Sequence, residues 1–187
     1  MGAFDYLAVL VSIIVGLAIT QLLTGWRGMV LARARVTSYW PLLVWTVVVL
    51  LVCVQSWWAM FGLRALATWT FADFAIVLAQ AIVLYMLAAL ALPDFGDSAR
   101  VDLAAHYFDH RRLFFGALVV LIAISLAKDM IIAGRLPSAT NVAFQACIGA
   151  GAVGAMLTRR PWYHAALAPA ALAVFAAYIA TLFARLP

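Results

Sequence analysis

The sequence predicts an all-α membrane protein, a bundle of six transmembrane helices, and two observations carry this prediction. Of the 187 residues, 68% are apolar and 10% are charged, and the mean hydropathy is +1.11. A soluble globular chain is about half apolar and about a quarter charged, and its interior has no room for such an excess. The apolar residues also form long continuous runs, which is typical of spanning helices and not of the alternating strands of a β-barrel.

Six runs have the length of a spanning helix, which needs about 20 largely apolar residues to cross the hydrocarbon layer. They cover residues 4–26, 39–63, 71–92, 113–133, 139–158 and 162–184. Prolines mark the breaks: Pro41 lies in the first turn of the second run, Pro93 follows the third and Pro161 precedes the sixth. No connection is long enough to separate domains, so we expect residues 1–187 to form a single membrane domain.

The connection between the third and fourth runs is the longest. Within it Val101, Ala104, Ala105 and Phe108 recur at helical spacing, with charged residues on the other face. This pattern predicts one short amphipathic helix at residues 100–112, lying in the cytoplasmic interface of the membrane.

Basic residues indicate the orientation. The chain has 11 Arg, one Lys and seven Asp, and the first, third and fifth loops hold eight of the twelve basic residues. The opposite side holds the other four, which are Arg64, Lys128, Arg135 and Arg185. Because loops rich in Lys and Arg stay in the cytoplasm, we expect both termini on the periplasmic or extracellular side of a bacterial inner membrane. The arginines are scattered through short loops, so we expect contact with the lipid bilayer and no nucleic-acid partner.

Asp102, His106 and His110 are spaced four residues apart and would form one row on a helix. Imidazole and carboxylate groups at this spacing can hold a metal. The alternative, which we favour, is that they are the polar face of the interfacial helix. We predict no cofactor, and no catalytic motif indicates an enzyme.

Several polar side chains lie within the predicted spans, where a charge at the centre costs about 2.5–3.5 kcal/mol on insertion scales and therefore normally turns inward. Four spans supply them at similar depth in the outer half of the bundle. We predict that a polar cavity there is lined by Asp73, Lys128, Asp129, Gln55, Gln80 and Gln145.

Lys128 is the only lysine, and fifteen uncharged residues precede it. Neighbours on a helix point about 100° apart, so Lys128 and Asp129 cannot pair directly, and Asp73 is the partner that we consider for Lys128. The alternative is that Lys128 extends to the outer interface. Interhelical hydrogen bonds without any solute are the alternative for the glutamines.

Small residues form two ridges that allow close helix contact. Gly16 belongs to the ridge of the first span, and Gly151 and Gly154 to that of the fifth. Such ridges pack within one bundle, between copies of a homo-oligomer or against other membrane subunits. The first functional hypothesis is therefore a channel or transporter-like protein for a small solute or ion. The alternative is a non-catalytic accessory or assembly subunit of a larger membrane complex.

Overall fold

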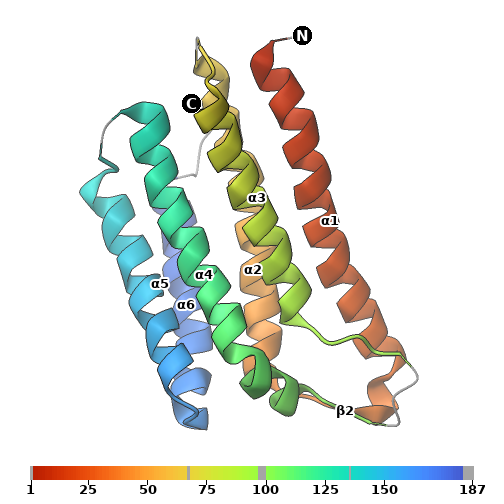
Figure 1. Ribbon diagram of the computed structural model, residues 1–187. Coiled ribbons are helices and arrows are strands. Elements are labelled where there is room, and N and C mark those ends of the chain that lie inside the picture. Colours follow the sequence, from red (N-terminus) through yellow and green to blue (C-terminus); the bar gives the residue numbers. More distant parts are fainter. Residues whose placement is uncertain (1, 67, 97–99, 135, 183–187) are drawn as a thin grey trace.

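The computed structural model describes residues 2–66, 68–96, 100–134 and 136–182. It contains six α-helices, and all six are long and apolar enough to cross a membrane (Figure 1). The helices are α1 (Ala3–Leu31), α2 (Trp40–Met60), α3 (Phe71–Ala91), α4 (Leu103–Ala133), α5 (Ala139–Leu157) and α6 (Pro161–Leu182). The prediction of an all-α fold with six spans is confirmed.

Short elements lie between the helices. The 3₁₀ turns η1 (Arg33–Arg35) and η2 (Phe61–Ala65) follow α1 and α2. The two-residue strands β1 (Val36–Thr37) and β2 (Val101–Asp102) pair in parallel, with Val36 opposite Val101 and Thr37 opposite Asp102. This pairing joins the α1–α2 connection to the α3–α4 connection.

The helix bounds differ from the expected ones in two places. Helix α1 continues to Leu31, and α4 begins at Leu103, so the segment expected as a separate interfacial helix is the start of the fourth span. No glycine or proline lies between Leu103 and Leu113, so nothing interrupts the backbone hydrogen bonds there. Helix α4 ends where Gly134 adopts a left-handed conformation, with φ of 61°.

The helices pack in two layers. Helices α1, α3, α4 and α5 lie side by side in that order, and α2 and α6 pack behind them (Figure 1). The connections α1–α2, α3–α4 and α5–α6 gather at one end of the bundle, which we call the loop end. Helix α1 begins and α6 ends at the opposite, terminal end. Of the basic residues expected on that side, Arg135 and Arg185 lie outside the described residues.

Aromatic side chains fill the centre of the loop-end half. Trp45 of α2 packs edge-on against Phe114 and Phe115 of α4, with ring centroids 5.8 and 5.1 Å apart. All three side chains are almost completely buried. We call these three residues the aromatic plug, because their rings fill the space between α2 and α4.

Candidate functional site

A polar chamber lies inside the terminal half of the bundle. Its volume is about 70 Å³, and five helices, α2 to α6, contribute to its wall. The polar side chains of the wall are Gln55, Ser56, Gln80, Ser125, Gln145 and Tyr178. Apolar residues form the rest of the wall and most of its surface, among them the aromatic side chains of Trp45 and Phe175. The structure therefore brings together the three glutamines Gln55, Gln80 and Gln145 that the sequence analysis placed at similar depth.

Asn141 of α5 is the centre of a hydrogen-bond network beside the chamber. Its side-chain Nδ2 donates to Asp129 Oδ2 at 3.1 Å, which joins α5 to α4. Its Oδ1 accepts from Gln145 Nε2 at 2.8 Å and from the Tyr178 hydroxyl at 3.1 Å. Gln145 Nε2 also lies 3.4 Å from Ser125 Oγ. The network joins the three helices α4, α5 and α6. It holds the amide of Gln145 in place, because both donor hydrogens of this amide have acceptors.

The carbonyl oxygen of Gln145 has no hydrogen-bond partner among the residues that the structure describes. The side chain is 7% exposed, and its Oε1 atom is buried without a hydrogen bond. Leaving a buried acceptor unpaired costs about 1–3 kcal/mol, so native proteins generally satisfy such atoms with protein groups, water or a ligand. Gln145, a residue of the chamber wall, thus keeps a buried acceptor that has no partner among the described residues.

The other side of the chamber adjoins a smaller cavity. This cavity has a volume of about 20 Å³ and shares Ser56 and Gln80 with the chamber, and Lys128 is in its wall. Within the described part of the chain, the side chains of Gln55, Ser56 and Gln80 form no hydrogen bond. They can therefore bind a polar molecule without first breaking a bond inside the protein.

Lys128 is half-buried and lies on α4 between these cavities and the terminal end. Among the residues that the structure describes, it makes no hydrogen bond and no ion pair. Asp129 follows Lys128 directly on α4. Asp129 itself accepts the hydrogen bond from Asn141. Lys128 therefore lines the smaller cavity, whereas Asp129 lines neither cavity and is bonded to Asn141 beside the chamber.

Asp73 does not pair with Lys128, contrary to the partner considered from the sequence. Its carboxylate accepts hydrogen bonds from the backbone N–H and the hydroxyl of Thr70, at 2.9 and 2.8 Å. Thr70 Oγ1 in turn accepts from the Asp73 backbone N–H at 3.2 Å, which completes a capping box at the start of α3. Asp73 lines neither cavity. Its carboxylate therefore stabilises the first turn of α3.

The side chains of Asp102, His106 and His110 also form hydrogen bonds within the protein. Asp102 Oδ1 accepts from the backbone N–H groups of Ala104 and Ala105, and so caps α4. The ring of His106 bonds to the carbonyl of Leu90 and that of His110 to the carbonyl of His106, at 3.3 and 3.0 Å. In the described part of the chain, no three His, Cys, Asp or Glu side chains are grouped to hold a metal.

The glycine ridges differ in what they contact. A Cβ atom at Gly151 would lie 2.7 Å from Leu167 Cδ1, and one at Gly154 would overlap the Tyr163 hydroxyl. These two glycines let α6 approach α5 closely within the bundle. Gly16 of α1 has no atom within 4 Å of an added Cβ, so its side of α1 faces outward.

A buried histidine was missed in the sequence. His164 of α6 is fully buried, and its Nδ1 lies 2.8 Å from the hydroxyl of Tyr107 on α4. Its Nε2 lies 3.1 Å from the carbonyl oxygen of Thr158. Because a carbonyl only accepts, Nε2 carries the proton, and Nδ1 of the neutral ring accepts from Tyr107. The sequence signal was a histidine in the first turn after Pro161, which alone does not distinguish a buried position from an exposed one.

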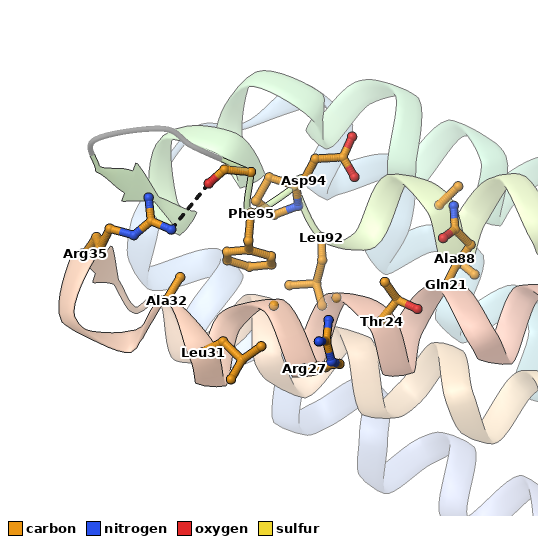
Figure 2. Close-up of a pocket in the computed structure, with 15 residues that line it drawn as sticks. Gln21, Thr24, Arg27, Leu31, Ala32, Arg35, Ala88, Leu92, Asp94 and Phe95 are labelled. Carbon is orange, nitrogen blue, oxygen red and sulfur yellow. Dashed lines mark hydrogen bonds between the residues drawn. The ribbon is translucent and has the colours of Figure 1, made fainter.

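A groove lies at the loop end, between α1 and the segment that follows α3 (Figure 2). Its volume is about 380 Å³, and Arg27 and Arg35 are among its polar residues. Arg35 donates to the carbonyl of Gly96 at 3.3 Å, which joins this segment to η1, the turn that follows α1. The groove shares no lining residue with the chamber. Its guanidinium groups suit the anionic headgroups of lipids.

Comparison with protein-family models, with curated proteins and with solved structures finds no match for this chain.

Proposed function

We propose that the protein is a channel or transporter-like pathway for a small solute or ion, and that the polar chamber is its binding site. The observation that carries this proposal is that Gln145 lines the chamber while its buried Oε1 has no hydrogen-bond partner in the described part of the chain. Helices that only need to pack in a membrane favour small and apolar contacts, and a buried polar group without a partner weakens them. A solute that donates a hydrogen bond to this oxygen offsets the cost of burying it.

The geometry also favours alternating access over an open pore. Towards the loop end the aromatic plug closes the chamber, and Trp45 belongs to both the plug and the chamber wall. A solute can therefore cross only after the plug moves. From the distribution of Arg, we place the loop end in the cytoplasm and the termini in the periplasm of a bacterial inner membrane.

Reconstitution into lipid vesicles tests the proposal. The purified protein is assayed for the flux of water, small neutral solutes and monovalent ions, beside vesicles without protein. Gln145→Leu removes the unpaired oxygen while keeping the volume of the side chain, and we expect it to abolish the flux. Gln21→Leu is the matched control, because Gln21 is an exposed amide that lines the loop-end groove and not the chamber. Equal flux for both variants, or none for the native protein, contradicts the proposal.

An accessory subunit is the second candidate, and the outward side of Gly16 favours it. Gly16 and the neighbouring Thr20 and Thr24 are exposed on α1, and no other described helix lies within 4 Å of a Cβ added at Gly16. Small residues at this spacing let a second helix approach closely. Purification from the native membrane in mild detergent tests this candidate: other subunits at fixed stoichiometry that are lost in Gly16→Leu support it. A preparation that contains this chain alone contradicts it.

A further inference from the structure

The walls of the loop-end groove are α1 and the segment that follows α3 (Figure 2). Pro93 disfavours a helical conformation at Leu92, which is extended with φ of −131° and ψ of 148°, so the chain leaves α3 here. Two glycines of α1 let this segment come close. A Cβ atom at Gly25 would lie 2.7 Å from Leu92 Cδ1, and one at Gly28 would lie 2.7 Å from Phe95 Cδ2. These contacts hold the two walls of the groove together.

The same contacts give the depth of the groove in the membrane. Helix α3 has 21 residues and is about 32 Å long, which matches the hydrocarbon layer of about 30 Å. Helix α1 has 29 residues and is about 44 Å long. Because Gly25 meets Leu92, it lies level with the end of α3. The part of α1 from Trp26 to Leu31 therefore extends past the hydrocarbon layer, among the lipid headgroups.

The groove has a net positive charge at this level. Its charged residues are Arg27, Arg35 and Asp94, so two guanidinium groups outnumber one carboxylate. Arg27 is exposed and forms no hydrogen bond and no ion pair within the described part of the chain. A guanidinium group binds phosphate through two parallel N–H donors. The donors of Arg27 can therefore bind a phosphate without breaking a bond to another described residue.

The second wall offers backbone donors. Asp94, Phe95 and Gly96 line the groove outside any helix or strand. Their N–H groups donate no hydrogen bond to another described residue. Successive backbone N–H groups bind phosphate oxygens in many proteins. Both walls therefore supply donors that suit one phosphate.

The lining changes towards the hydrocarbon layer. Gln21 lies one turn before Gly25 on α1, and Ala88 and Ala89 lie about one turn before Leu92 on α3. An amide and two small apolar side chains suit the ester groups and the first methylene groups of a lipid. The groove is therefore amphipathic, with charge at the level of the headgroups and small side chains one turn deeper.

We propose that the loop-end groove binds one anionic phospholipid, whose phosphate accepts hydrogen bonds from Arg27 and from the backbone of the segment after α3. Basic pockets between membrane helices bind such headgroups. A zwitterionic headgroup brings an ammonium group, which the net positive charge of the groove repels. The lipid contacts α1 and the segment after α3 together, so it links the first and third spans. The groove shares no lining residue with the chamber, so this site is independent of the proposed function.

Native mass spectrometry of the whole chain tests this site. The protein is purified in a mild non-ionic detergent, stripped of lipid and titrated with phosphatidylglycerol, phosphatidylethanolamine or phosphatidylcholine. We expect one molecule of phosphatidylglycerol to bind more tightly than either zwitterionic lipid and to raise the melting temperature, since a ligand stabilises the state that binds it. Equal binding of the three lipids overturns the proposal. Glycerol 3-phosphate represents a free anion, and an equal rise in melting temperature at the same concentration overturns the assignment to a lipid.

Three variants locate the bound lipid. Arg27→Gln removes a guanidinium group of the groove, and we expect it to weaken the binding of phosphatidylglycerol about fivefold. Arg33→Gln is the matched control, because Arg33 is an exposed arginine of η1 that does not line the groove. We expect it to weaken binding by less than about twofold, since salt screens a charge outside the site.

Asp94→Asn removes the carboxylate of the groove, so we expect tighter binding of phosphatidylglycerol, which a misfolded variant cannot produce. Equal effects of the two arginine variants, or no gain in Asp94→Asn, overturn the proposal.

Discussion

The bond between His164 and Tyr107 gives the most quantitative prediction. His164→Phe keeps an aromatic ring at this position, where the native ring meets those of Tyr107 and Phe108 at right angles, with centroids 5.2 and 5.1 Å apart. The substitution removes both ring nitrogens. The Tyr107 hydroxyl, on a side chain that is 3% exposed, and the Thr158 carbonyl then lose their partners.

The expected cost follows from these two lost bonds. An unpaired group in a buried position costs about 1–3 kcal/mol. The Tyr107 hydroxyl bears the larger part, because Thr158 is half-exposed and water can reach its carbonyl. We therefore expect His164→Phe to lower the free energy of unfolding by about 2 kcal/mol and Tyr107→Phe by about 1 kcal/mol.

A double-mutant cycle measures the bond directly. The two single variants and the double variant are unfolded reversibly in mixed micelles with increasing SDS, and helix content is followed by circular dichroism. Because the double variant loses the bond only once, we expect a coupling energy of about 1 kcal/mol.

The control cycle combines His164→Phe with Thr20→Val, which removes an exposed hydroxyl bonded only to the carbonyl of Gly16. These changes are far apart on different helices, so their effects should add to within about 0.5 kcal/mol. A coupling energy between His164 and Tyr107 no larger than that of the control cycle would refute the assignment of this bond.

Three further predictions concern packing, capping and lipid. Gly151→Leu forces a side chain against Leu167 and should lower the free energy of unfolding by about 1–3 kcal/mol. Gly16→Leu should change the free energy of unfolding of the isolated chain by less than about 0.5 kcal/mol. Unfolding in SDS measures both variants. Asp102→Ala removes the cap of α4 and should cost about 1 kcal/mol, while Zn²⁺ should leave the melting temperature of the native protein unchanged. Arg27→Gln should reduce the anionic lipid that co-purifies with the protein, measured by mass spectrometry, and unchanged lipid content contradicts a headgroup site in the groove.

The six spans could be predicted because length and hydropathy determine them, whatever the packing. The sequence also gives depth along each helix, which is why Gln55, Gln80 and Gln145 could be assigned to one level. It does not give the rotation of each helix about its axis, since packing against neighbours sets that. The structure supplies the rotations, and they turn these three side chains towards one cavity.

Asp73 and His164 show what was missed and why. Thr70 and Asp73 have the spacing of a capping box, a local signal that competes with any long-range ion pair and takes precedence here. His164 gave no local signal, because its partner Tyr107 is 57 residues away in the sequence. A contact at such separation depends on which helices become neighbours, and a single sequence does not state this.

The small parallel pairing of β1 with β2 has a consequence for the order of assembly in the membrane. Val36 and Thr37 leave the ribosome after the first span, but Val101 and Asp102 follow only after the third. The first connection must therefore wait, with its backbone groups solvated, while two more spans are inserted. Once the pairing forms, it holds the start of α4 beside the connection that follows α1. The bridge thus links the first connection of the bundle to the helix that opens its second half.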